Sequence, residues 1–204
     1  NQTPVFLISG IFREGQYFFK WYGAWARTQL NAFSSFFVQN NKSAELLQKI
    51  GFSNSIVAGD TRFDRVLQVK QHNKRFDLID SFANKNLIIV AGSTYIDDEK
   101  LLQSCLNKLM TVGINYKIIL APHVVSPERI TEIEILFGTE NCVRYSQFKI
   151  NLTKKNVLII DNIGMLSSLY SYAHLAYIGG GLGKGIHNTL EAAVYSIPLL
   201  FGNN

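Results

Sequence analysis

The sequence has no long hydrophobic run and few cysteines. No stretch of about 20 apolar residues occurs in the 204 residues, so we expect no membrane-spanning helix. Cys105 and Cys142 are far apart in apolar surroundings and form no metal or redox motif, which favours a reducing compartment. There is no initiator methionine and no signal peptide, and residues 4–8 and 197–202 already read as strands. We therefore expect a fragment of a longer chain.

Several chemical motifs are missing as well. No group of His, Cys and carboxylates has metal-ligand spacing, so no protein-held metal and no cofactor is predicted. Neither a Ser-His-Asp order nor a G-x-S-x-G turn is present, and Lys184 is followed by Gly185 rather than by the Ser or Thr of a Walker A motif. The net charge of +5 is spread along the chain, so no nucleic-acid partner is expected. Attraction to phosphates or to an anionic membrane surface, and a merely basic protein, fit this charge equally well.

The most informative segment that is present is rich in glycine. An apolar strand at 175–178 runs into five glycines within residues 179–185, and a helix pattern starts at Asn188. Glycine lets the backbone approach a ligand closely, and a helix N-terminus attracts anions, so this arrangement suits a phosphate. Glu191, in the first turn, could accept hydrogen bonds from a ribose, which indicates a nucleotide-sugar site. A glycine turn without a ligand is the alternative, and His187 together with Asn188 and Glu191 favours the ligand.

Short strands alternate with helices along the chain. This alternation predicts an α/β fold with parallel sheets and Rossmann-like topology. We predict a first Rossmann-like domain at 1–65, a polar inter-domain connection with some helix at 66–85, and a second domain at 86–204. The predicted strands are 4–9, 35–39, 55–58, 87–91, 116–121, 156–160, 175–178 and 197–201; the predicted helices are 43–50, with Ser43 as N-cap, 97–110, 127–137, 165–172 and 188–195.

An aromatic and basic segment occupies residues 15–30. Its apolar residues recur at roughly helical spacing, with Lys20 and Arg27 among them. We expect a helix whose aromatic side chains pack in a core. A helix that rests on a membrane interface or lines the acceptor side is the alternative.

Polar and small residues follow four strands of the predicted second domain. Ligands of open α/β sheets bind outside the carboxyl ends of the strands, and four consecutive polar ends favour a binding site. Each has a structural alternative: Ser93 or Thr94 could cap a helix, His123 could simply be exposed, and His187 could hold the glycine loop. The four ends are 92–94, 122–123, 161–164 and 179–191.

Four segments of the chain resemble motifs of the bacterial 3-deoxy-D-manno-octulosonic acid (Kdo) transferases. Residues 59–64 resemble G-x-x-[RK]-F-D, and 91–94 resemble A-x-S-T, with Asp98 and Glu99 shortly after. Residues 179–191 are similar to G-G-S/G…G-x-H-N-P-L-E, and 197–202 to I-P-x-x-x-G. The resemblance covers nearly the whole chain, and its His-Asn-x-Leu-Glu block is the most specific part.

The resemblance implies a GT-B glycosyltransferase with two Rossmann-like domains, of which 1–65 would end the acceptor-side domain and 86–204 form most of the donor-binding domain. Such an enzyme moves Kdo from CMP-Kdo to a lipid A precursor (lipid IVA) in lipopolysaccharide synthesis, with inversion and without a metal. It works at the cytoplasmic face of the bacterial inner membrane, so donor, acceptor and membrane surface are the expected partners. The family's general base is expected upstream of residue 1, so no catalytic residue is assigned and the fragment alone is expected to be inactive.

The resemblance also implies donor-site residues. They are Ser93, Thr94, Pro122, His123, Ile163, Gly164, Met165, Gly181, Lys184, His187, Asn188, Thr189, Leu190 and Glu191. Two of these positions depart from the family pattern, because Thr189 replaces a proline and Pro122-His123 stands where the family has Pro-Arg-His. His123 or Lys184 could replace that arginine, which would meet the charge of the donor. Arg13 is a further, weaker candidate.

Two other functions fit the residues. A different GT-B protein, such as a UDP-sugar transferase or an epimerase, would prefer UDP to CMP. A non-catalytic nucleotide-binding domain would use the same strand ends without chemistry.

Overall fold

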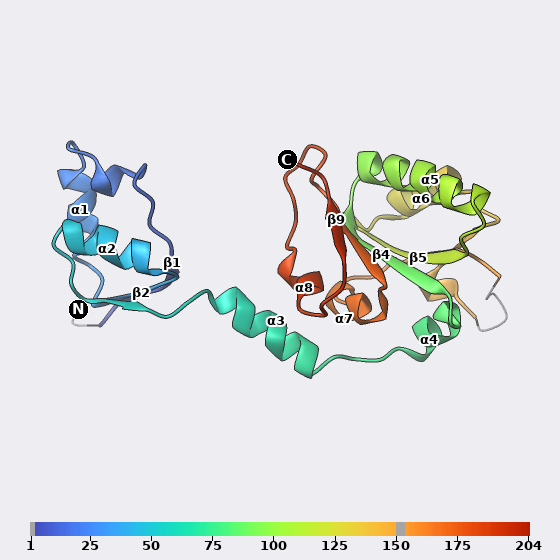
Figure 1. Cartoon of the computed structure of the whole chain (residues 1–204), viewed down its shortest axis with the longest axis horizontal. Helices are drawn as coiled ribbons and strands as arrows, with labels where there is room; N and C mark the ends of the chain where they lie inside the picture. Colours follow the sequence, from blue (N-terminus) through green and yellow to red (C-terminus); the bar gives the residue numbers. More distant parts are fainter. Residues whose placement is uncertain (1–2, 150–153) are drawn as a thin grey trace. The chain divides into compact units, whose positions relative to one another are not determined.

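The computed structural model describes residues 3–149 and 154–204. The chain divides into two compact units, residues 1–65 and 66–204, each with its own hydrophobic core (Figure 1). Within the described residues, no helix combines the length and the hydropathy needed to cross a membrane. The α/β fold with parallel sheets that the alternation predicts is confirmed.

The first unit is a three-stranded parallel sheet, in the order β1-β2-β3. Its core gathers around Phe36 and Leu47, which are fully buried. Its elements are β1 (Phe6–Gly10), η1 (Tyr17–Phe19), α1 (Ala24–Leu30), β2 (Ser35–Val38), α2 (Asn41–Lys49) and β3 (Ser55–Val57); α3 (Thr61–Gln71) then leads into the second unit.

The cap of α2 differs from the prediction. Asn40, rather than Ser43, is the N-cap, because the Asn40 side chain accepts a hydrogen bond of 2.9 Å from the Ser43 amide. The Ser43 hydroxyl instead accepts a hydrogen bond of 2.9 Å from the Phe12 amide, and Ser43 is completely buried. An Asn and a Ser three residues apart are both good caps, so the sequence alone does not distinguish them.

The prediction that the aromatic segment packs in a core holds for only part of it. Phe18 and Phe19 pack against the core of the first unit, where their rings contact Phe12. Only a short 3-10 turn and the seven-residue helix α1 form there, and α1 buries just Ala26 and Leu30. The Trp21 side chain is 92% exposed and that of Trp25 is 76% exposed. The alternative, an aromatic surface that meets a partner or a membrane, therefore fits the structure better.

The second unit is a six-stranded parallel sheet with the strand order β6-β7-β5-β4-β8-β9. Short loops and helices connect the strands (Figure 1). Its elements are α4 (Asp77–Ala83), β4 (Leu87–Thr94), α5 (Ile96–Thr111), β5 (Tyr116–Pro122), α6 (Pro127–Phe137), β6 (Cys142–Arg144), η2 (Tyr145–Gln147), β7 (Val157–Ile159), α7 (Leu166–Leu169), η4 (Tyr170–Tyr172), β8 (Leu175–Ile178), α8 (Leu190–Ala193) and β9 (Leu199–Phe201).

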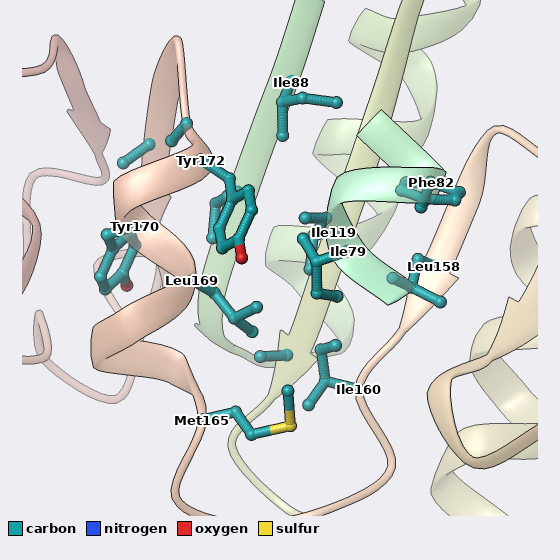
Figure 2. Close-up of a cluster of buried hydrophobic side chains, with 14 of the residues drawn as sticks. Ile79, Phe82, Ile88, Ile119, Leu158, Ile160, Met165, Leu169, Tyr170 and Tyr172 are labelled. Carbon is teal, nitrogen blue, oxygen red and sulfur yellow. The ribbon is translucent and has the colours of Figure 1, made fainter. Parts of the chain in front are cut away.

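Both faces of the second sheet are covered. On one face, α5 and α6 pack side chains such as Leu106 and Ile133 against the strands. On the other face, α4, α7 and η4 contribute a second cluster, in which Leu169 and Tyr172 point toward the strands that carry Ile88 and Ile119 (Figure 2). Because both faces are buried, β4 and β5 are almost continuously apolar, as expected for a parallel sheet.

The segment 66–85, predicted as an inter-domain connection, contributes to the second core. Ile79 and Phe82 of α4 are completely buried in the cluster shown in Figure 2. The four apolar residues of α4 are interspersed with Asp77, Asp80 and Ser81, and the helix follows a strongly polar stretch, so the segment looks like a surface connection from its composition alone. The polar part of the segment is α3 and the turn after it, where Lys70 donates a hydrogen bond of 2.7 Å to the Val194 carbonyl.

Candidate functional site

The centre of the second sheet is a topological switch point. β4 lies between β5 and β8; the chain passes from β4 to β5 on one side and reaches β8, on the other side, only after β7. Open α/β sheets bind ligands outside the carboxyl ends of the strands at such a point. Ser93 and Thr94 lie at the end of β4, and Gly179 directly follows β8.

At this point the two chain segments approach so closely that only glycine fits. The Gly179 amide donates a hydrogen bond of 2.9 Å to the Gly92 carbonyl, and a Cβ on Gly179 would lie 2.3 Å from the Ser93 carbonyl oxygen. Ser93 has a φ of 54°, in the left-handed region that is costly for serine. Backbone strain of this kind is concentrated at ligand sites and switches, which supports a functional role for the end of β4.

Asp98 holds the glycine stretch in place through hydrogen bonds. This residue is 1% exposed and accepts hydrogen bonds from the Gly180 amide at 2.9 Å, the Tyr95 amide at 2.9 Å and the Tyr177 hydroxyl at 2.7 Å. Three donors compensate the cost of burying this carboxylate. The sequence indicated Asp98 only as an acidic residue at a helix start; its tie to Gly180, 82 residues away, has no local signal.

The rings of Tyr95, His123 and His187 contact one another beside the ends of β4 and β5. The His123 and His187 rings are stacked with centroids 4.5 Å apart, and Tyr95 lies 4.9 Å from His123 and 5.6 Å from His187. Within the described part of the chain, the buried His187 Nε2 has no hydrogen-bond partner. Burial lowers the pKa of His187 below its ordinary value, and the neighbouring His123 lowers it further. The fold thus disfavours the protonated form of His187.

Main-chain hydrogen bonds connect the predicted site residues at the ends of β4, β5 and β8. The His123 amide donates to the Thr94 carbonyl at 3.0 Å, and Pro122 is the register partner of Thr94. The His187 amide donates to the Gly179 carbonyl at 3.2 Å. Gly181 lies against the chain after β9, because the Asn204 amide donates to its carbonyl at 3.0 Å. The ends of β4, β5 and β8 therefore come together as predicted, although the role of each residue in binding stays a prediction.

The helix after the glycine stretch is much shorter than predicted. Instead of residues 188–195, α8 covers Leu190–Ala193, with Thr189 as N-cap. The Leu190 amide is already bonded to the Asn188 side chain at 3.1 Å. The predicted bounds of this helix are therefore wrong, and a single turn whose first amide is occupied adds little dipole. Anion binding beside the glycine stretch stays a prediction. The Asn188 amide group also donates to Glu191 at 3.0 Å, which orients that carboxylate.

The end of β7 is separated from β4 by β5. Ile163 is 89% exposed there and Gly164 is also exposed, with a φ of 95°. Met165 is buried in the hydrophobic core of Figure 2, so only its backbone could meet a ligand. The Asp161 carboxylate accepts hydrogen bonds from the Ser146 amide, at 3.0 Å, and hydroxyl, which holds η2 in place.

A cavity of about 490 Å³ adjoins the glycine stretch. Thr94 and Lys184, both predicted donor-site residues, line it, and so does Arg129, which no sequence pattern predicted. Arg129 is bonded to the fully buried Glu99, which also accepts a hydrogen bond of 2.8 Å from Thr94. Burial raises the pKa of Glu99, and the hydrogen bonds from Thr94 and Arg129 oppose this shift.

No three His, Cys, Asp or Glu side chains of the described residues are grouped closely enough to hold a metal ion. The cavity and the switch point therefore offer charged, hydroxyl and imidazole groups, rather than a ready set of metal ligands.

The fold and the switch-point site define the class of protein: two α/β units with parallel sheets, of the Rossmann-like GT-B type. A putative UDP-N-acetylglucosamine 2-epimerase from Listeria monocytogenes has this fold, with a TM-score of 0.59, 12% identity, and 98% of this chain aligned to 50% of that one. The C-terminal CMP-Kdo binding domain of WaaA from Acinetobacter baumannii aligns with 68% of this chain and 69% of its own, at 21% identity and a TM-score of 0.49.

Sequence comparison shows a similarity to the Kdo transferases. Residues 1–65 match the family model of the 3-deoxy-D-manno-octulosonic-acid transferases (kdotransferases). Proteins named 3-deoxy-D-manno-octulosonic acid transferase from Rickettsia felis and Rickettsia bellii are 28% and 29% identical over 85% and 83% of this chain. The chain is thus a relative of the Kdo transferases, which confirms the predicted resemblance. It spans 37% and 40% of the length of these two relatives.

Proposed function

We propose that this chain is part of an inverting glycosyltransferase that moves Kdo from CMP-Kdo to a lipid A precursor, lipid IVA. The observation that carries this proposal is the meeting of strained Ser93, His123 and the glycine stretch at one switch point, in a relative of the Kdo transferases. Fold similarity alone would fit many nucleotide-sugar enzymes. The resemblance to the Kdo transferases favours a CMP-Kdo enzyme among these nucleotide-sugar enzymes.

The proposed reaction is a direct displacement at the anomeric carbon of the donor sugar. A hydroxyl oxygen of the acceptor forms the new glycosidic bond, the bond to the CMP phosphate breaks, and CMP leaves with the bonding electrons. Lys184 and backbone amides of the glycine stretch are close to the cavity and would stabilise the charge on that phosphate without a metal. A carboxylate takes the proton of the acceptor hydroxyl, and we assign it to no residue of this chain.

The nucleoside part of the donor has its own contacts in the proposal. The Asn188 side chain holds Glu191 in position to accept hydrogen bonds from the ribose hydroxyls. The exposed backbone at Ile163 and Gly164 is free to meet the cytosine edge. His187 supports the glycine stretch, because its amide donates to the Gly179 carbonyl at 3.2 Å and its ring stacks on that of His123.

Calorimetric titration of the chain with CMP, UMP and UDP tests the donor. We expect CMP to bind tightest, and Glu191→Ala to weaken CMP binding about tenfold, because one good hydrogen-bonded contact to a charged group is worth about 1.5–3 kcal/mol. Glu45→Ala is the matched control, since Glu45 is an exposed helix residue of the first unit. It should bind CMP like the unchanged chain.

Two results would contradict the proposal. Tighter binding of UDP than of CMP would favour a UDP-sugar transferase or epimerase. No binding of any nucleotide would remove the support that the second unit gives to a donor site.

In the proposal, the protein acts at the cytoplasmic face of a bacterial inner membrane. The exposed rings of Tyr17, Trp21, Tyr22 and Trp25 support it, because Trp and Tyr prefer the membrane–water interface. Lys20 and Arg27 lie in the same segment, and residues 15–34 contain no Asp or Glu. Cations without nearby carboxylates favour a surface of anionic lipids.

A further inference from the structure

The cavity beside the glycine stretch has a wall that the family resemblance does not account for. Its lining comes from three places in the second unit: the start of α5, the start of α6 and the loop 180–184. The volume of about 490 Å³ is in the range of small-molecule sites. The residues proposed to hold the nucleoside, Glu191 and those around Ile163, are not among those that line it.

Arg129 is the fixed cation of this cavity. Its side chain is only 15% exposed, one end of the guanidinium is bonded to Glu99, and Nη1 donates to Glu132 at 2.8 Å. A guanidinium carries five N–H groups, so further donors remain for a ligand after these two contacts among the described residues. Glu99 is completely buried, and a buried carboxylate is costly unless it is paired. Glu99 thus holds the guanidinium rigidly at the cavity wall.

The rest of the wall is mixed in charge. Asp97, Glu128 and Glu132 bring carboxylates to the cavity in addition to Asp98, whose carboxylate is already bound by three donors. Lys184 brings the second cation. A group as highly charged as a pyrophosphate would be repelled by three carboxylates. Sugar hydroxyls, in contrast, donate hydrogen bonds to carboxylates, and a single ligand carboxylate can be shared by Arg129 and Lys184. Tyr95 and Leu182 add apolar surface for the C–H face of a sugar ring.

We propose that this cavity is the subsite for the sugar of the donor, a polyhydroxylated sugar acid, and that Arg129 binds its carboxylate. This inference rests on the proposed function and deepens it. It also assigns the cation that the sequence left open: β5 ends in Pro122-His123, without the arginine of the family pattern, and Arg129, at the start of the following helix, supplies the guanidinium from a different position.

Titration of the chain with CMP and with CMP-Kdo tests the subsite. We expect CMP-Kdo to bind about tenfold tighter than CMP, since the sugar acid adds at least one charge-assisted hydrogen bond. Arg129→Gln should lose most of this preference while its affinity for CMP stays within about twofold, because Arg129 has no part in the proposed CMP contacts. The double variant Glu99→Gln with Arg129→Gln removes the buried charge together with its partner, so a folded protein without the guanidinium can be measured.

Arg144→Gln is the matched control. Arg144, in β6, forms a partly buried pair with Glu134 of α6, the helix that also carries Arg129. Arg144 does not line the cavity. It should keep the preference for CMP-Kdo. Equal affinity of the unchanged chain for CMP and CMP-Kdo, or a full preference in the double variant, would overturn the subsite and leave a CMP site intact. Failure to bind either ligand would overturn the donor function itself and the subsite with it.

Discussion

Asp98 and Glu99 are neighbours in the sequence, and both carboxylates are buried at the start of α5, but they do different things. Asp98 accepts three hydrogen bonds from neutral donors and ties the start of α5 to Gly180. Glu99 is paired with a cation, Arg129, and with the Thr94 hydroxyl. Buried carboxylates are stable only with such partners. One short segment thus fixes both the glycine stretch and the guanidinium of the cavity.

At the same scale, His187 should make stability depend on pH. Its pKa is lowered from the ordinary value of 6.5 by burial and by His123, and Asp98 opposes the shift. The unfolded chain therefore binds a proton near that value while the folded chain resists it. Stability from this residue is fully present above about pH 6.5 and is lost as the pH falls toward the folded pKa. Urea unfolding at pH 7.5 and 5.5 should show a smaller loss of stability in His187→Phe than in the unchanged chain.

Phenylalanine keeps a ring against His123 and removes only the titrating nitrogens. His72→Gln is the control, because His72 is exposed after α3 and far from the ring cluster in sequence. It should lose stability like the unchanged chain. An identical loss in all three proteins would show that His187 is not held neutral by the fold.

The residues of the site could be predicted from the sequence only where they follow a strand. Ser93, His123 and His187 stand at ends of apolar runs, and parallel strands bring such ends to one edge. Arg129 could not be found in this way. Its pairing with Glu132 is a local helix spacing, but its pairing with Glu99 joins residues 30 apart on two helices. No periodicity encodes such a contact.

At the scale of elements, the glycine stretch is shaped by a close backbone approach at its start. A methyl group at Gly179 would meet only backbone atoms, the Ser93 carbonyl among them, and backbone cannot move aside cheaply. Gly179→Ala should therefore lower the free energy of unfolding by about 1–3 kcal/mol, the usual cost of overpacking, and weaken CMP binding. Thermal unfolding and the CMP titration measure the two effects.

Gly183→Ala in the same stretch is the control, since nothing lies within 4 Å of an added Cβ and its φ is compatible with alanine. Its stability should be equal to or slightly above that of the unchanged chain. Equal losses in both variants would mean that the whole stretch, and not the contact at Gly179, requires glycine.

The elements that the sequence predicted best are those with long apolar runs or strong end signals. α6 has the predicted bounds, because Pro127 starts it and Gly138 follows it. β6 was missed, since its three residues, Cys142–Arg144, are too few to show a pattern. α8 was predicted too long, because residues 188–195 have helical composition, whereas the Asn188 side chain binds the Leu190 amide and residues 194–196 form a turn.

At the scale of the whole molecule, each hydrophobic cluster belongs to a single unit. The cluster around Phe36 contains only residues of the first unit, and the clusters on the two faces of the second sheet contain only residues of the second unit. The predicted boundary at residue 65 stays a prediction, but this division of the core means that each unit can carry a separate task. The second unit contains the proposed donor site, and the first contains the aromatic surface.

The aromatic surface leads to a test of where the molecule works. Trp21 and Trp25 gain by leaving water for the lipid interface, and Lys20 and Arg27 gain from anionic head groups. In cosedimentation, the chain should bind vesicles with phosphatidylglycerol more strongly than vesicles of phosphatidylcholine alone, and added salt should weaken the binding. Trp21→Ala with Trp25→Ala should weaken it about tenfold or more. Ile135→Ser, at a residue of α6 that is 71% exposed, is the control and should bind as before. If the double variant sediments with vesicles as well as the unchanged chain does, these exposed rings serve some contact other than a membrane.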